Sequence, residues 1–419
     1  MTDATIAAPA ALSSRRLVGL AISIRLLVDT SVQIFNPFLT VIATGLGIDV
    51  LAMGRLVSLR SAMGLATPIL GALADRVGYR PVMYLSLLAA ALGLLMVGLS
   101  RAWTTAALGM AIMGLGLSTF IPTLQAYLSA RLPYERRAQG MAVIEYAWAL
   151  AGIVGLFLTG LLIEAAGWRA PFFVLAGGLL LGAIGLSAVP ASAPQPRAAL
   201  CQPAVGWRPI LAIVRSLVDL GRDAGSAWGA IAAQALIAYA VSHVIIIHGG
   251  WLTREYGLGP AQLGSVALAG GLADLSASVL VSLVTDRIGK RRSVLLGTAG
   301  AFVAYSLLPL FNRGMVLAVI GICLARFFFE FSIVSNIPLL SEQIPEQRAK
   351  VLTLASASGL VGITLASLSG PWAYTRWGVW GLGPAAALAS ALALVIVLVR
   401  VRERGAADRS GPPYVNPGS

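Results

Sequence analysis

Charged residues are scarce in this chain: Asp, Glu, Lys and Arg make up only 11% of its 419 residues. Hydrophobic residues make up 58%, and the mean hydropathy is +0.85. A soluble domain cannot bury so large an apolar fraction, so we expect most of the chain to face lipid. Cysteine is also rare. Cys201 and Cys323 provide neither a metal-binding spacing nor an expected disulfide.

The sequence motifs of nucleotide-driven pumps and of common hydrolases are absent as well. No phosphate-binding glycine loop precedes a Lys-Ser/Thr pair, so ATP is not expected to supply the energy. No His-Glu-x-x-His, paired-cysteine or nucleophile-elbow motif indicates an enzyme, and we expect no cofactor and no metal. The net charge of +13 could suggest nucleic acid, but the arginines lie in short loops between apolar segments. They indicate membrane topology, and no nucleic-acid partner is expected.

Twelve apolar segments are long enough to cross a bilayer as helices, for which about 20 residues are needed. They predict an all-α membrane protein with twelve transmembrane helices in two six-helix bundles. The expected spans are 17–44, 51–74, 81–100, 103–130, 138–163 and 170–189, then 226–250, 261–285, 292–311, 314–340, 350–374 and 379–400. The expected domains are an N-tail (1–16), a first bundle (17–189), a linker (190–224), a second bundle (225–400) and a C-tail (401–419). Alternating apolar and charged residues in the linker predict a helix on the membrane surface.

Lys and Arg mark alternate loops between the predicted spans. Most of the 30 Lys and Arg residues fall in the tails, in the linker and in the loops around 76–80, 131–137, 286–292 and 348–350. The remaining loops hold one arginine each: Arg101, Arg169, Arg254, Arg313 and Arg376. Because cytoplasmic loops are enriched in Lys and Arg, we expect a multi-pass protein of the inner (plasma) membrane with both termini in the cytoplasm.

A charged turn occurs twice, half a chain apart. Asp75-Arg76-Val77-Gly78-Tyr79-Arg80 recurs as Asp286-Arg287-Ile288-Gly289-Lys290-Arg291. Glu135-Arg136-Arg137-Ala138 recurs at the same offset as Glu346-Gln347-Arg348-Ala349. Two matching loops in each half indicate a duplication with parallel repeats. Such an architecture places a binding site between the halves, near the middle of the bilayer.

The segment from Gly71 to Arg80 resembles the signature loop between spans 2 and 3 of major facilitator superfamily transporters. The second copy occupies the matching loop between spans 8 and 9, and the resemblance covers the whole chain. It implies gating loops made of Gly71, Asp75, Arg76, Gly78 and Arg80 in one half and Asp286, Arg287 and Gly289 in the other. It also implies that Asp75 accepts hydrogen bonds at a helix end of the other half and so closes a cytoplasmic gate. The alternative is that Asp75 and Arg76 only complete a tight turn at Gly78.

A second segment points to a subfamily. Gly167-Trp168-Arg169-Ala170-Pro171-Phe172, before span 6, is similar to a segment of drug:proton antiporters. Those proteins usually have a Gly-Pro-Gly-Gly stretch in span 5 and an arginine in span 4. This chain has neither. Tyr79 also stands where the signature loop usually has a basic residue.

Charged residues inside the predicted spans need a reason, because each costs about 2.5–3.5 kcal/mol at mid-bilayer. In span 1, one helical face carries Arg25, Asp29, Gln33, Asn36 and Thr40. In span 10, Arg326 and Glu330 stand four residues apart, so each helix can neutralise its own pair. The resemblance implies that spans 1 and 10 line a central cavity. The two pairs then either bind substrate and protons or serve only as permanent structural salt bridges.

Four carboxyl groups are candidates for proton coupling: Asp29, Glu145, Asp274 and Glu330. Glu145 has no basic residue one turn away, so it is the best placed to exchange protons near neutral pH. It could instead be a neutral acid bonded across a helix contact. Asp274 could partner Arg60 or a histidine of span 7. The candidates for a substrate cavity are Arg25, Gln33, Asn36, Gln125, Tyr239, His243 and Arg326.

These observations predict a monomeric secondary transporter that works by alternating access and takes its energy from protons or another coupling ion. The first hypothesis is proton-coupled efflux of small amphipathic compounds. A second is uptake or exchange of an organic anion, because Arg25 and Arg326 would face one cavity. A third is a transporter-like protein that moves no solute and assists assembly or lipid and pigment delivery.

Overall fold

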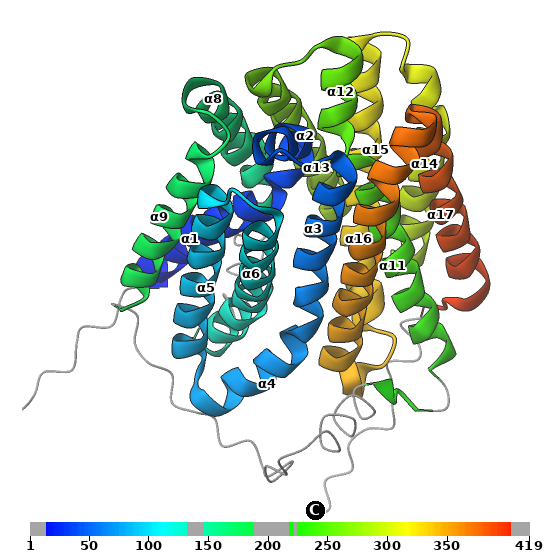
Figure 1. The fold of residues 1–419 in the computed structure, drawn as a ribbon. Helices are drawn as coiled ribbons and strands as arrows, with labels where there is room; N and C mark the ends of the chain where they lie inside the picture. Colours follow the sequence, from blue (N-terminus) through cyan, green and yellow to red (C-terminus); the bar gives the residue numbers. More distant parts are fainter. Residues whose placement is uncertain (1–13, 132–145, 188–217, 222–223, 404–419) are drawn as a thin grey trace, which may run out of the picture.

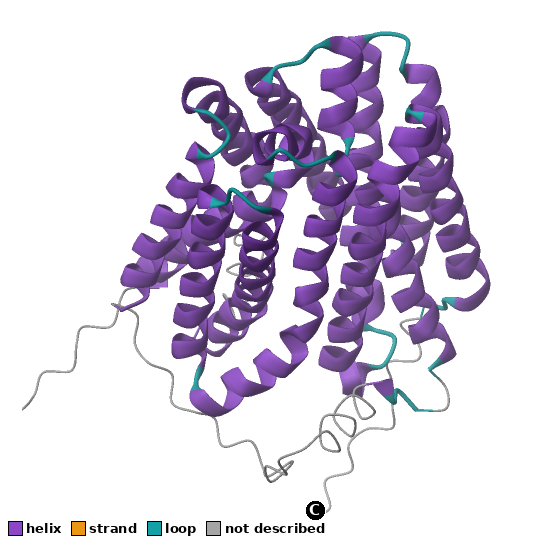
Figure 2. Ribbon diagram, viewed as in Figure 1, coloured by secondary structure: helices purple, strands orange, loops and turns teal. Residues whose placement is uncertain are grey.

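The computed structural model describes residues 14–131, 146–187, 218–221 and 224–403, and all regular structure in these ranges is helical (Figures 1 and 2). Ten helices are long and apolar enough to cross a membrane, and a bent pair near the N-terminus forms an eleventh span. The remaining predicted span, 51–74, is divided into two shorter helices. The predicted all-α class and the two-bundle repeat are therefore confirmed.

The first half begins with span 1, which consists of α1 (Ser14–Gln33) and α2 (Phe35–Leu46). Span 2 consists of α3 (Val50–Met63), the short 3₁₀ turn η1 (Gly64–Ala66) and α4 (Thr67–Val77). Next come α5 (Tyr79–Leu99), α6 (Trp103–Arg131), the fifth span (Tyr146–Ala166) and α9 (Ala170–Ser187). The fifth span contains a π-helical turn, η2 (Ala151–Gly155), followed by α8 (Leu156–Ala166).

In the second half, α11 (Gly225–Ile245) and α12 (His248–Tyr256) form span 7. The other helices are α13 (Pro260–Ile288), α14 (Lys290–Phe311), α15 (Met315–Ser341), α16 (Arg348–Trp377) and α17 (Val379–Arg400). The linker 190–224 falls almost entirely outside the described residues, so its surface helix and the domain bounds stay predictions.

Span 1 is bent by 58° between α1 and α2, which the sequence analysis did not anticipate. The cause is Pro37, because a proline lacks the backbone N–H and its ring clashes with the carbonyl four residues earlier, here that of Gln33. Span 7 breaks at the equivalent place, at Ile246 and Ile247 between α11 and α12. The two breaks meet: a Cβ atom on Gly249 of α12 would overlap the Pro37 carbonyl oxygen.

The two halves repeat one internal contact around their charged turns. Gly78 and Gly289 have φ angles of 95° and 92°, which glycine adopts readily, and each starts the next helix. Arg80 of α5 then donates from Nε to the Leu186 carbonyl (3.1 Å) at the end of α9. Arg291 of α14 likewise donates from Nη2 to the Leu398 carbonyl (2.8 Å) near the end of α17. Both arginines therefore tie helices within their own half.

The halves contact each other mainly toward one end of the molecule. We call this the Asp49 end, after the turn between α2 and α3, and the opposite end, at the α4–α5 turn, the Gly78 end (Figure 1). The main contacts between the halves join α2 to α12 and α13, α3 and η1 to α16, and η2 and α8 to α13. In contrast, α4 leads to the Gly78 end and has its main contacts with α5, α6 and η1 of its own half. The described helices are therefore closed together at the Asp49 end.

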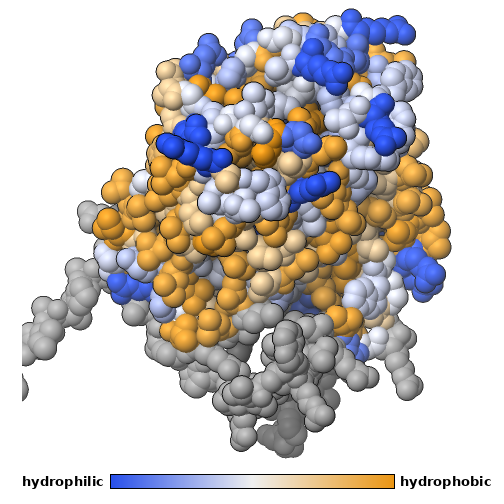
Figure 3. Space-filling view, viewed as in Figure 1, coloured by the Kyte–Doolittle hydropathy of each residue, from blue (hydrophilic) through white to orange (hydrophobic). Residues whose placement is uncertain are grey.

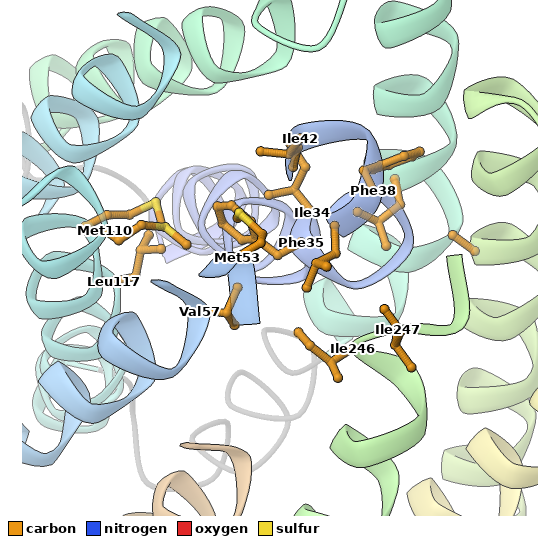
Figure 4. Packing of buried hydrophobic residues seen from close by; sticks show 14 of the residues in the cluster. Ile34, Phe35, Phe38, Ile42, Met53, Val57, Met110, Leu117, Ile246 and Ile247 are labelled. Atoms are coloured by element: carbon orange, nitrogen blue, oxygen red, sulfur yellow. The ribbon is translucent and has the colours of Figure 1, made fainter. Parts of the chain in front are cut away.

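Apolar side chains from both halves pack where the helices close. Ile34, Phe35 and Phe38 of the bend in span 1 are fully buried in one cluster with Ile246 and Ile247 of the other half (Figure 4). The outer surface, in contrast, exposes many large apolar side chains, among them Leu85, Leu181 and Val399. The space-filling view shows a broad hydrophobic band on this face, with a more hydrophilic end above it (Figure 3). This is the surface of a multi-pass membrane protein.

Candidate functional site

The polar face of span 1 points into the protein. Arg25 and Asp29 of α1 are 4% and 0% exposed, and the Nε atom of Arg25 donates to Asp29 Oδ2 at 2.8 Å. This is the ion pair that the sequence predicts within the helix. Because both side chains are buried, neither of them faces lipid. Removing either partner would leave a buried charge without compensation, so we expect either single substitution to be destabilising.

Gln33, one turn after Asp29, links span 1 to span 5. Its Nε2 donates to the Trp148 carbonyl at 3.0 Å, and the side chain is 1% exposed. Trp148 lies just before η2, where the π-helical turn offsets the regular hydrogen bonds of the helix. An amide side chain from a neighbouring span is a suitable donor for a backbone carbonyl at such a site.

We expect Gln33→Leu to lower the stability of the detergent-purified protein by about 1–3 kcal/mol, because it leaves a buried carbonyl unsatisfied. Thermal unfolding followed by circular dichroism measures this. Gln33→Glu keeps the size but replaces the donor with an acceptor, so it should be no better than leucine. A melting temperature unchanged in both variants would contradict the assigned role.

The second buried pair joins Arg326 of α15 to Asp274 of α13. Arg326 Nε donates to Asp274 Oδ1 at 3.1 Å, and its Nη2 also contacts Oδ2, so the guanidinium binds the carboxylate in a two-pronged way. Exposures of 7% and 2% place both side chains in the protein interior. Such bidentate pairs are the strongest hydrogen-bonded charge pairs. Among the described residues, each half thus buries an Arg–Asp pair.

The sequence analysis grouped Arg326 with Glu330, whereas the structure adds a partner from another helix. Asp274 and Ser278 stand one turn apart on α13, and they face Arg326 and Glu330, one turn apart on α15. Ser278 Oγ donates to Glu330 Oε1 at 2.9 Å. The suggested pairing of Asp274 with Arg60 is not seen. Arg60 donates instead to the Val32 carbonyl at 2.7 Å and lies 5.0 Å from the centre of the Phe35 ring.

Tyr239 and His243 of α11 lie within the second half. Their rings stack with centroids 5.4 Å apart, and the Tyr239 hydroxyl and His243 Nδ1 both lie 2.9 Å from Ser369 Oγ of α16. His243 is 1% exposed. In this conformation the cluster braces α11 against α16, and substrate contact by these two side chains stays a prediction.

The structure describes only some of the remaining candidate site residues. Asn36 and Gln125 are half-buried in α2 and α6, respectively. Asp286 and Arg287 are exposed at the end of α13, before Gly289. Glu145 lies outside the described residues, as do the side chains of Asp75 and Arg76, so the proton role of Glu145 and the gating role of Asp75 remain predictions. Gly71 lies in α4, which has its main contacts with helices of its own half.

One carboxylate that the sequence analysis did not single out connects the halves. Glu164, at the end of α8, accepts a hydrogen bond from the Ala261 backbone N–H at 3.0 Å. Ala261 is in the first turn of α13, where unpaired N–H groups and the helix dipole favour an acceptor with negative charge. The interaction expected of Asp75 at the Gly78 end is thus present at the Asp49 end with another acid.

Comparison with known families agrees with this geometry. The sequence profile of the Major Facilitator Superfamily matches residues 21–249 and again residues 230–414, which together include both halves. The chain is a member of the Major Facilitator Superfamily. The family resemblance of the two charged turns is therefore confirmed, and the protein is a membrane transporter by family.

Individual relatives of this superfamily member agree in fold but differ in named function. The chain is 24% identical over 344 residues to an uncharacterized MFS-type transporter of Bacillus subtilis (strain 168), which covers 81% of each chain. It is 31% identical over 117 residues to the multidrug resistance protein MdtG of Serratia proteamaculans (strain 568), which covers 28% of each. The crystal structure of a D-xylose–proton symporter superimposes with a TM-score of 0.74 at 16% identity, covering 93% of this chain and 99% of that one.

Proposed function

We propose that this protein exports small amphipathic compounds in exchange for protons. The observation that carries the proposal is a buried Arg–Asp pair in each half of a two-bundle transporter whose described helices are closed together at the Asp49 end. Protonation of a buried carboxylate breaks its ion pair with arginine. The guanidinium is then free, and the charge of the cavity wall changes. A gradient of protons can then bias the rocking of the halves.

The distribution of Lys and Arg assigns the Gly78 end to the cytoplasm. On this assignment the structure is closed toward the outside and faces inward. An exporter in this state collects its cargo from the cytoplasm or the inner leaflet. The Gly167–Phe172 segment and the partial similarity to a multidrug resistance protein support export over import.

Flux into proteoliposomes under an imposed pH gradient tests this proposal, with a panel of cationic dyes and small carboxylates as cargo. We expect Glu145→Gln to retain dye binding and to lose the dependence of transport on the pH gradient. Asp49→Asn is the matched control, since Asp49 caps α3 through the Ala52 N–H and asparagine caps helices equally well. Gradient-driven flux that is equal in wild type and Glu145→Gln would refute the proton role.

Arg25 and Arg326, the two buried arginines that pair with aspartates, favour one other candidate, the exchange of organic anions. On this hypothesis a substrate carboxylate displaces Asp29 from Arg25 or Asp274 from Arg326. The same flux panel separates the two functions: carboxylate flux that is lost in Arg326→Gln while dye flux persists identifies an anion exchanger. Absence of flux for every cargo would point to a transporter-like protein without a transported solute.

A further inference from the structure

The turn between α16 and α17, at the Asp49 end, carries three of the nine tryptophans of the chain together with an arginine. Trp372 and Trp377 of α16 and Trp380 of the adjoining α17 are 45%, 54% and 66% exposed. The Trp372 and Trp377 rings meet edge to face with their centroids 5.0 Å apart. The guanidinium carbon of Arg376, also exposed, lies 5.8 Å from the centre of the Trp372 ring. We call these four side chains the Trp–Arg cluster.

The Trp–Arg cluster continues the lipid-facing surfaces of α16 and α17. On α16, exposed residues recur every three or four positions and so share one face of the helix: Val361, Leu365, Leu368, Trp372 and Arg376. One face of α17 is likewise formed by Trp380, Pro384, Leu388, Leu392, Val395 and Val399. Exposed apolar faces of membrane-spanning helices contact acyl chains. The cluster lies where both faces reach the Asp49 end, which is the headgroup depth at which tryptophan is enriched.

The polar groups of the cluster are all hydrogen-bond donors, since a guanidinium and an indole N–H cannot accept. Within the described part of the chain, no hydrogen bond or ion pair joins these four side chains to another residue. In contrast, Trp251 Nε1 donates to Asn312 Oδ1 at 2.8 Å. No acidic residue occurs between Pro371 and Gly383. A ligand of the cluster must therefore supply several acceptor oxygens and a negative charge, and arginine is well suited to bind phosphate.

The equivalent turn of the first half has different chemistry. Gly167 between α8 and α9 corresponds to Gly378 at the offset of the duplicated charged turns, and their φ angles are 83° and 57°. The counterparts of the four cluster residues are Leu161, Ala165, Ala166 and Arg169. Arg169 donates to the Gly98 and Ser100 carbonyls at 3.0 and 3.1 Å, so its guanidinium is bound within the first half. The turn thus forms without the cluster, and its geometry does not account for the three tryptophans.

We propose that the Trp–Arg cluster binds the phosphate of an anionic phospholipid in the leaflet at the Asp49 end. Arg376 pairs with the phosphate, and the Trp372 ring holds the guanidinium through a cation–π contact. The indole N–H groups of Trp377 and Trp380 donate to the remaining phosphate and ester oxygens. The acyl chains lie along the apolar faces of α16 and α17.

A lipid bound at this turn fixes the depth of the second half in the bilayer, because interfacial Trp and Arg anchors set the position of a span. The helix that it holds, α16, is also the one that contacts α3 and η1 of the first half. One side of that contact therefore stays at constant depth while the first half moves against it. This binding depends neither on which cargo the protein moves nor on the direction of transport.

Native mass spectrometry of the full chain tests the proposal by counting the lipids that stay bound after addition of phosphatidylglycerol or phosphatidylcholine with the same acyl chains. Basic residues at the Gly78 end also attract anionic lipid, so the comparison between variants isolates this site. Arg376→Gln should weaken one phosphatidylglycerol site about fivefold and leave the phosphatidylcholine count unchanged. Trp372→Leu removes the cation–π contact and should weaken the same site about two- to fivefold. Arg313→Gln is the matched control, since Arg313 is exposed in the α14–α15 turn at the same end, which contains no tryptophan.

The possible outcomes are distinguishable. An unchanged phosphatidylglycerol count in Arg376→Gln would overturn the assignment, as would an equal loss in Arg313→Gln, because any exposed arginine at this end would then suffice. An equal loss of phosphatidylcholine would overturn the requirement for an anionic lipid. Displacement of the lipid by glycerol 1-phosphate would identify a free phosphate as the ligand and overturn the lipid. If Arg376→Gln unfolds below the wild-type temperature, Trp380→Leu, which removes an indole donor, is expected to lose the same lipid.

Discussion

Asp274→Asn should lower the stability of the folded protein by about 3–5 kcal/mol. Breaking a buried ion pair leaves the remaining charge without compensation, and Arg326 is 7% exposed with two of its nitrogens on this carboxylate. Thermal unfolding in detergent measures the effect. The same substitution at Asp286, exposed at the end of the same helix, should change stability by no more than about 0.5 kcal/mol.

A double variant distinguishes whether the Asp274–Arg326 pair is only structural or is also needed for transport. Asp274→Leu combined with Arg326→Met removes both charges, and apolar replacement of a buried pair is often neutral or stabilising. We expect this variant to melt at or above the wild-type temperature and to transport nothing in the proteoliposome assay. Wild-type transport by the double variant would show that the pair is structural only.

Gly249→Val should abolish closure of the Asp49 end. A Cβ atom there overlaps the Pro37 carbonyl oxygen, which belongs to the backbone and cannot rotate away. Overpacking destabilises the conformation closed at the Asp49 end by about 1–3 kcal/mol. Its population relative to the open conformation then falls by roughly 5- to 150-fold. The protein should then rest open at the Asp49 end and lose most of its transport.

Spin labels on opposite halves report this change directly. Ala166→Cys at the end of α8 and Trp377→Cys at the end of α16 are exposed positions at the Asp49 end, in a background with serine in place of Cys201 and Cys323. Their separation should increase in Gly249→Val. Gly177→Val is the control, because a Cβ atom at Gly177 of α9 meets nothing within 4 Å. A folded Gly249→Val protein with the wild-type distance would show that the contact does not control closure.

Structural features that depend on residues close together in the sequence could be predicted, whereas contacts between residues far apart in the sequence could not. The duplicated turn, the apolar segments and the polar face of span 1 are local patterns, and the structure confirms the helices and the Arg25–Asp29 pair that they predict. The bend in span 1 was also accessible from the sequence, since Pro37 marks it. The overall hydrophobicity of residues 17–44, however, predicts one continuous span and not a bent one.

Contacts between helices could not be read in the same way. Arg326 is one turn from Glu330 along the chain, yet its bidentate partner is Asp274. The orientation of α13 about its axis places the Asp274 carboxylate against two nitrogens of the Arg326 guanidinium. The Glu164 contact with α13 depends on the closure of two halves that are far apart in sequence.

Main-chain atoms of small residues take part in the closure at the Asp49 end, beside the apolar side chains that pack there. Gly54 approaches the Ser367 carbonyl and Gly160 approaches the Pro260 carbonyl, each so closely that an added Cβ atom would lie 2.5 Å from the oxygen. Cargo selection, in contrast, is expected to reside in side chains near the bilayer centre. The helix contacts that close the Asp49 end and the side chains that select the cargo can therefore change independently during evolution. A paralogue could acquire a new cargo by exchanging a few polar side chains while it keeps the rocking motion.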